Sequence, residues 1–105
     1  MLARTWHGAV PAEKADAYYH FLLRTAVPDY RGTAGNAGVF ILRREEEGLA
    51  HFLLVTLWES WEAVGRFAGP IVERAHYYPE DPDFLVELEP LVTHYEVLEV
   101  PAESY

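Results

Sequence analysis

The sequence contains no cysteine among its 105 residues. This absence excludes disulfides, thiolate zinc sites, iron–sulfur clusters and cysteine nucleophiles, and it leaves the redox compartment undetermined. Basic residues are scarce: eight Lys and Arg stand against 17 Asp and Glu, which gives a formal net charge of -9. Nucleic acid and anionic membranes would be repelled by this charge, so neither is expected as a partner.

Long apolar runs are also missing. The longest, Phe52 to Trp58, is far too short to span a bilayer, and no basic-then-apolar signal region opens the chain, so a cytoplasmic protein is expected. Half of the residues are hydrophobic and 14% are aromatic, which is too much apolar surface for intrinsic disorder. At this length we expect one domain, residues 1–105, with one modest core.

Alternating apolar and polar residues predict four strands, and helical spacing predicts helices between them. The predicted strands are Leu2–Val10, Gly38–Arg44, Leu49–Glu59 and Leu91–Val100. The predicted helices are Pro11–Ala26, ended by Pro28; Ser60 to about Gly69, restarting at Pro70 and continuing to Pro79; and Asp81–Leu88. The order β-α-β-β-α-β predicts a ferredoxin-like α+β fold, a four-stranded antiparallel sheet with its helices on one face and the strand order 4-1-3-2.

The third predicted strand is apolar on both faces. One face carries Phe52, Leu54, Thr56 and Trp58, and the other carries His51, Leu53, Val55 and Leu57. The few helices of this chain can cover only one side of the sheet, and an exposed apolar face of this size normally marks an interface. A homodimer formed face to face is therefore expected.

The run Leu57-Trp58-Glu59-Ser60, followed by Glu62-Ala63, Phe67 and then His76, resembles the antibiotic-biosynthesis-monooxygenase-like family of the dimeric α+β barrel superfamily. The similarity in element order covers nearly the whole chain. Members include cofactor-independent oxygenases of polyketide aromatics, haem-degrading monooxygenases and small proteins with no assigned activity. The resemblance implies a dimeric α+β barrel and a small oxygenase without flavin or metal, which acts on a small aromatic substrate between helices and sheet.

The haem-degrading branch of that family can be compared position by position. Its pattern has an asparagine on the first strand, a tryptophan on the second long helix and a histidine as axial iron ligand. The corresponding residues here are Arg4 or Thr5, Phe67 and His76, so only the histidine is retained. No cofactor is therefore expected, and haem ligated by His76 is kept as an alternative.

Two charged or titratable residues are the main site candidates. His76, on the second predicted helix, is the candidate catalytic base at the wall of a pocket, or else a surface histidine paired with Glu73 one turn earlier. Arg4 lies in the middle of an apolar strand, where a guanidinium needs a partner. That partner is either a carboxylate such as Glu96 or the phenolate or carboxylate of a substrate.

Three aromatic residues, Trp58, Phe67 and Tyr78, are expected to wall the ligand cavity, although each could simply fill the core. His7, His51 and His94 fall on neighbouring strands and would bind a metal only if they share a face and register; otherwise they are histidines at the sheet rim, and no metal is assigned.

Two other functions stay open: a non-catalytic binder of haem or another planar ligand, and an unliganded homodimer whose cavity is filled by its own side chains.

Overall fold

Four strands form one antiparallel sheet in the computed structural model, which describes residues 1–99. The strands are β1 (Leu2–Pro11), β2 (Asn36–Glu46), β3 (Leu49–Trp58) and β4 (Thr93–Glu96). They lie in the order β2-β3-β1-β4, which confirms the predicted topology. β4 is shorter than predicted, because it pairs only with Leu2 to Thr5 of β1. Val100, the predicted end of that strand, lies outside the described residues.

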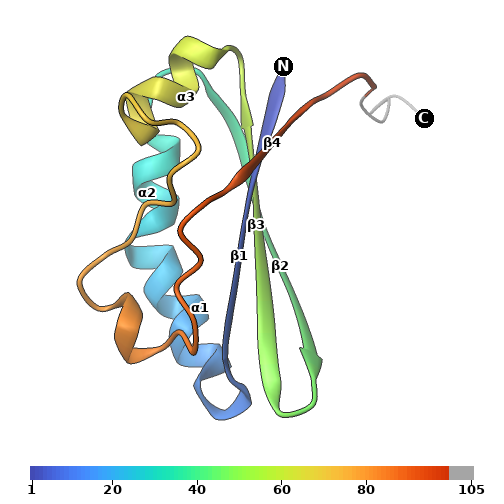
Figure 1. Cartoon of the computed structure of the whole chain (residues 1–105), viewed down its shortest axis with the longest axis vertical. Helices are drawn as coiled ribbons and strands as arrows, with labels where there is room; N and C mark the ends of the chain where they lie inside the picture. The colour runs from blue at the N-terminus through green and yellow to red at the C-terminus, as the bar shows by residue number, and fades with distance from the viewer. Residues whose placement is uncertain (100–105) are drawn as a thin grey trace.

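The helices lie on one side of this sheet (Figure 1). They are α1 (Ala15–Arg24), which follows the 3-10 turn η1 (Ala12–Lys14), then α2 (Ala26–Arg31) and α3 (Trp61–Ala68). The predicted ferredoxin-like α+β fold is therefore confirmed. Within residues 1–99, no helix has the length and apolar character needed to cross a membrane.

The prediction that Pro28 ends the first helix is wrong. The helix breaks at Thr25, whose ψ is -79°, and α2 then begins at Ala26 with Pro28 in its first turn. A proline ring within a continuous helix would collide with the carbonyl of Arg24, four residues earlier. In the first turn of a new helix the missing N–H costs nothing, because that position has no partner inside the helix.

The second predicted helix is shorter than expected. Ser60 caps α3 as predicted, since its side chain accepts a hydrogen bond from the Ala63 N–H at 3.1 Å. The helix ends at Gly69, whose φ of +81° suits glycine. No helix resumes at Pro70, so the predicted continuation to Pro79 is wrong.

Residues 69–92 form an irregular segment, in which the predicted helix Asp81–Leu88 is reduced to the 3-10 turn η2 (Asp81–Asp83). The segment folds back on itself through Ala75 N–H to Pro90 O (2.9 Å) and Val92 N–H to Glu73 O (2.8 Å), and it pairs with the edge of β1 through Val86 N–H to Ala9 O. Its backbone groups are therefore bonded outside any helix. This segment completes the layer over the sheet.

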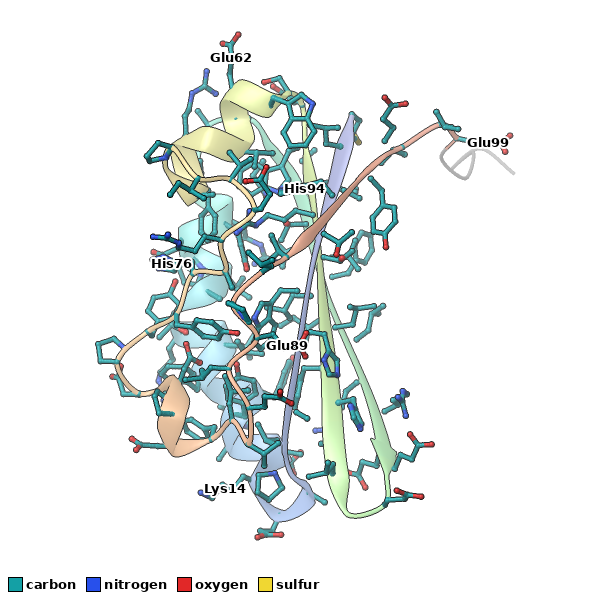
Figure 2. All side chains as sticks on the ribbon, in the orientation of Figure 1. Lys14, Glu62, His76, Glu89, His94 and Glu99 are labelled. Atoms are coloured by element: carbon teal, nitrogen blue, oxygen red, sulfur yellow. The ribbon has the colours of Figure 1, made fainter. Side chains whose placement is uncertain are left out.

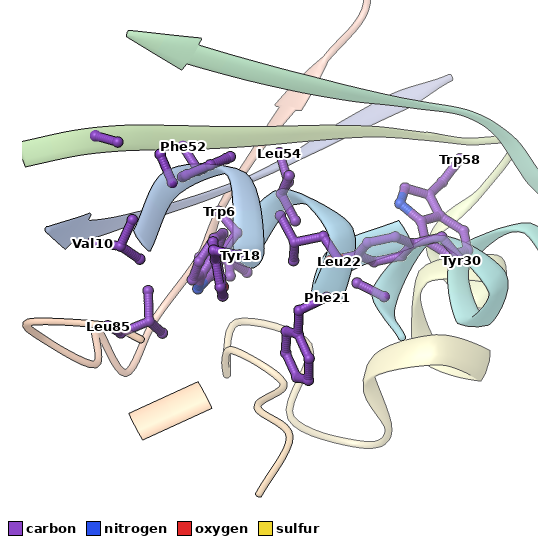
Figure 3. Packing of buried hydrophobic residues seen from close by; sticks show 14 of the residues in the cluster. Trp6, Val10, Tyr18, Phe21, Leu22, Tyr30, Phe52, Leu54, Trp58 and Leu85 are labelled. Atoms are coloured by element: carbon purple, nitrogen blue, oxygen red, sulfur yellow. The ribbon is translucent and has the colours of Figure 1, made fainter. Parts of the chain in front are cut away.

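The core lies between the sheet and this layer (Figure 3). Its largest fully buried side chains are Trp58, Tyr18 and Phe52. The sheet contributes Leu2, Trp6, Val10, Phe52, Leu54 and Trp58, and the helices contribute Tyr18, Phe21, Leu22, Tyr30 and Val64. The core is thus filled by the residues that the predicted alternation assigns to one face of β1 and one face of β3.

The opposite face of the sheet has no covering layer among the described residues (Figure 1). Phe40 and Leu42 of β2, Leu53 of β3 and Tyr95 of β4 are 37–57% exposed. In register, Leu42 lies beside Leu53, and Phe40 lies beside Val55. We call this surface the open face.

Candidate functional site

A narrow cavity lies between the sheet and the helical layer. Its walls are Arg4, Trp6, Tyr18, Leu22, Ala26, Tyr30, Leu54, Phe67, His76, Tyr77, Tyr78, Asp81 and Val92. The predicted site residues Arg4, Phe67, His76 and Tyr78 therefore share one cavity. Trp58 does not line it; the indole is fully buried and packs behind Phe67, with ring centroids 5.8 Å apart. The free volume of about 20 Å³ has room for a water molecule.

Arg4 is the buried cation of this cavity. Its Nη1 donates to the Val72 carbonyl at 2.5 Å, its Nη2 donates to the Arg74 carbonyl at 3.0 Å, and His94 Nε2 lies 3.3 Å from Nη1. Among residues 1–99, no carboxylate pairs with it, so the predicted alternative of Glu96 as partner is not formed. Burial lowers the pKa of Arg4 from its ordinary value. The guanidinium keeps its charge even so, because its ordinary pKa is above 12.

Phenol groups surround the rest of the cavity. Burial raises the pKa of Tyr30 to about 12, although the positive charge of Arg4 acts to lower this pKa. Burial also raises the pKa of Tyr18, Tyr77 and Tyr78. These phenols are therefore neutral near pH 7 and act as hydrogen-bond donors: Tyr77 Oη donates to the Glu89 carbonyl at 2.5 Å. None of them supplies the negative charge that Arg4 lacks.

Asp81 also lines the cavity, and the sequence analysis did not single it out. Its carboxylate accepts bonds from Tyr18 Oη at 3.2 Å and from the Tyr78 N–H at 2.6 Å, and it is almost completely buried. Burial raises the pKa of Asp81. The acceptor bonds show that it fixes the turn at Tyr78. In the sequence Asp81 is only the first residue of a predicted helix, so its place in the cavity could not be found from the pattern.

His76 lies on the irregular segment, so the prediction that it lies on a helix is wrong. Figure 2 shows it on the side of the helical layer that is away from the sheet. Its ring contacts Tyr78 and Phe67, at centroid distances of 5.0 and 5.5 Å. The predicted pairing with Glu73 is absent from the ion pairs of the described part of the chain. His76 is therefore an exposed imidazole at the rim of the cavity.

A second, wider space adjoins the first. It is a surface cleft of about 360 Å³ lined by Pro28 and Asp29 of α2, Gly32, Thr33, Arg66, Phe67 and His76. Phe67 and His76 line both the cleft and the cavity. These two side chains therefore lie where the cavity and the cleft adjoin.

The three histidines considered for a metal do not come together. His7 and His51 lie on the open face, with His7 Nε2 2.9 Å from His51 Nδ1, and His7 Nδ1 lies 2.5 Å from Glu89 Oε2. His94 lies beside Arg4 and against Trp61, with ring centroids 5.0 Å apart. Within residues 1–99, no group of three or more His, Asp or Glu side chains is arranged to hold a metal ion. The His7–Glu89 contact instead fastens the irregular segment to the sheet.

No family model matches the sequence, and no curated protein matches it. Solved structures do match. A Nitrosomonas europaea protein named "putative antibiotic biosynthesis monooxygenase" aligns with a TM-score of 0.67 at 16% identity, covering 94% of this chain and 100% of its own. A Bacillus cereus protein with the same name aligns at 0.65 and 14% identity, covering 96% of both chains.

A third match is the haem-degrader MhuD from Mycobacterium tuberculosis, whose structure has two haems bound in its active site. It aligns with a TM-score of 0.64 at 22% identity, covering 97% of this chain and 100% of its own. At sequence identities this low, the three matches carry information on the fold alone. The chain therefore has the fold of the antibiotic-biosynthesis-monooxygenase-like proteins.

Proposed function

We propose that this protein is a small oxygenase without flavin or metal, which acts on an aromatic substrate held as an anion by Arg4. The observation that carries the proposal is that Arg4 has no carboxylate partner among residues 1–99, because Asp81, a carboxylate that also lines the cavity, is bonded to Tyr18 Oη and the Tyr78 N–H instead. Arg4 is 3% exposed and is bonded to two carbonyls and a histidine, with no carboxylate partner in the described residues. Carbonyl dipoles stabilise a guanidinium but do not cancel its charge, so an anionic ligand would complete the site.

The aromatic walls favour a planar ligand. Phe67 lies under the guanidinium at 5.6 Å, and Trp6 donates its Nε1–H to Tyr77 Oη at 3.1 Å. Aromatic walls are typical of sites that bind aromatic small molecules. A hydroxylated aromatic ring with its acidic oxygen at Arg4 fits both features.

Arg4 would supply the chemistry by stabilising the deprotonated substrate. A positive charge in a desolvated site lowers the pKa of a bound phenol, and the phenolate is the form that gives an electron to oxygen. For 1-naphthol the overall reaction is one naphthol plus one O₂ giving 1,4-naphthoquinone plus one water. One oxygen atom enters the ring, and the other leaves as water.

His76 is the proposed base that takes the phenol proton. It is the imidazole that lines the cavity, and its exposed edge can pass the proton to water. We expect His76→Ala to fold normally and to lose turnover, because the substitution removes no buried apolar volume. Trp58 is proposed to support the site from behind by holding Phe67, and Tyr78 to form the wall.

Haem binding without turnover is the second candidate, because the matched structure of MhuD holds haem. Arg4 could face a propionate and His76 could face iron. In this conformation the cavity fits neither haem nor a naphthol, since its free volume of about 20 Å³ holds only a water molecule, so either ligand requires the cavity to open. Titration with haemin tests this candidate: a Soret shift that is lost in His76→Ala would favour haem over the oxygenase.

We further propose that the protein is a homodimer joined through its open faces. The face carries exposed apolar side chains on β2, β3 and β4, and a two-fold axis would place the same residues of two copies against each other. Phe40, Leu42, Leu53 and Tyr95 would then be buried in both copies.

The oxygenase proposal is tested with 1-naphthol and isotopically labelled oxygen, in buffer with a chelator and no added flavin. The expected result is naphthoquinone that carries one labelled atom with wild-type protein, and no product with Arg4→Gln. Product formation at the rate of a protein-free control would overturn the proposal.

A further inference from the structure

We infer that the cleft beside α2 is the outer half of the ligand site, and that the Phe67–His76 pair is a movable partition between this cleft and Arg4. The cleft is about 360 Å³ and the cavity about 20 Å³. Sites that bind small organic ligands are typically about 300 Å³ or larger. Of these two spaces, the cleft reaches that size and the cavity contains the Arg4 guanidinium. The identity of the inner ligand rests on the proposed function.

The contacts of Phe67 place it between the two spaces. Its ring packs at 4.5 Å from Tyr30 and 5.8 Å from Trp58 on the core side, and Arg4 lies 5.6 Å from its centroid. Its ring also contacts His76, at a centroid distance of 5.5 Å. A molecule that moves from the cleft toward the guanidinium therefore meets these two rings.

Both side chains can move without breaking an element of the fold. Phe67 is the last residue but one of α3, just before Gly69 at a positive φ. His76 lies in the irregular segment, outside any helix or strand. A rotation of either ring breaks ring–ring contacts, and a rotation of Phe67 also breaks its contact with the Arg4 guanidinium. Such a rotation would join the cleft to the cavity.

The cleft also indicates what the outer end of the ligand carries. Asp29, Thr33 and Arg66 give it a polar wall, while Phe67 is its aromatic inner wall. Arg66 donates to the Ala34 carbonyl at 2.9 Å, and Asp29 accepts the Tyr78 hydroxyl. The fitting ligand class is a hydroxylated aromatic of two or more fused rings, with an acidic oxygen inside at Arg4 and a polar substituent in the cleft.

Acrylamide quenching of tryptophan fluorescence tests the partition without any ligand. The chain has three tryptophans, of which Trp61 is 53% exposed while Trp6 and Trp58 are buried. In a Trp61→Phe background the emission therefore comes from the two buried indoles, and Trp6 lines the cavity. We expect Phe67→Ala to raise the quenching constant several-fold and His76→Ala to raise it less.

Phe84→Ala is the matched control. Phe84 is a partly buried phenylalanine that packs against Tyr18 and Phe21 and lines neither space. The control removes the same atoms and should leave quenching near the background value. An equal rise in Phe84→Ala, or no rise in Phe67→Ala, would overturn the partition. Circular dichroism checks folding, and Phe67→Leu replaces Phe67→Ala if the latter unfolds.

Stopped-flow binding of 1-hydroxy-2-naphthoate separates this inference from the proposed function. Because the partition slows entry of the ligand in wild type, removing the ring in Phe67→Ala should raise the association rate constant by about tenfold. Phe84→Ala should not raise it. Absence of binding by every variant, together with the expected quenching pattern, would overturn the proposed function and leave the partition standing. Binding at equal rates in wild type and Phe67→Ala would overturn the partition.

Discussion

Arg4 joins the sheet to the irregular segment and leaves a positive charge in the cavity. The same guanidinium that bonds the Val72 and Arg74 carbonyls lies over the ring of Phe67. A buried charge without a countercharge is costly, so stability alone gives little reason to keep it. Its position is better explained by a ligand that brings the opposite charge.

Replacing Arg4 with lysine should separate its structural role from its charge. A lysine keeps the charge but cannot bond both carbonyls in the planar geometry of a guanidinium, so we expect Arg4→Lys to lower the free energy of unfolding by about 1–3 kcal/mol. Urea denaturation measures this loss. Arg66→Lys, at an exposed arginine that bonds the Ala34 carbonyl, should change stability by less than about 0.5 kcal/mol. Equal losses in both variants would contradict the structural role.

His94 should make the stability depend on pH. Burial, and secondarily the charge of Arg4, lower the pKa of His94 below its ordinary 6.5. Below pH 6.5 the unfolded chain therefore binds a proton that the folded chain does not yet bind, and the free energy of unfolding falls as the pH falls through this window. We expect His94→Gln to lose less stability than wild type on acidification. An NMR titration that gives His94 a pKa of 6.5 or higher would be incompatible with this prediction.

The strand pattern, the helical spacing and the family resemblance together predicted part of the cavity. Arg4, Phe67, His76 and Tyr78 line it as expected, because the sheet register fixes Arg4 and the end of α3 fixes Phe67. Asp81 and Tyr77 also line it but were not predicted, since their positions depend on the path of an irregular segment. Whether any of these residues binds or turns over a ligand stays a prediction.

At the level of elements, regular alternation was a better guide than helical spacing. The strands follow the alternation closely, whereas the apolar residues of Ile71–Tyr78 have helical spacing without forming a helix. Three features outside that spacing decide the outcome: prolines at 70, 79, 82 and 90, the positive φ of Gly69, and the carbonyl bonds to Arg4. The first two interrupt a helix locally, and the third requires the tertiary structure.

The cap of α3 gives a prediction at this scale. Ser60→Ala removes the acceptor for the Ala63 N–H and should lower the free energy of unfolding by about 1 kcal/mol. Ser60→Thr keeps a hydroxyl at the same place and should retain most of the stability. Thermal or urea unfolding measures both, and an equal loss in the two variants would show that the hydroxyl does not cap the helix.

At the scale of the whole molecule, the open face predicts the oligomeric state. Leu42 and Leu53 are paired in register near its centre and are 49% and 37% exposed. We expect sedimentation equilibrium to show a dimer at micromolar concentration for wild type and a monomer for Leu42→Glu/Leu53→Glu. Leu23→Glu, at a leucine of the helical layer that is 41% exposed, should stay dimeric. A monomeric wild type would contradict the dimer.

The central claim is that the charge of Arg4 holds an aromatic anion, and the ionisation of bound 4-nitrophenol tests it most directly, because the phenolate has its own visible absorption band. The account predicts that wild-type protein and Arg4→Lys lower the pH at which the bound probe becomes phenolate, and that folded Arg4→Gln loses this shift. A bound probe that ionises at the same pH in wild type and Arg4→Gln, or a probe that does not bind to wild type, would contradict the claim.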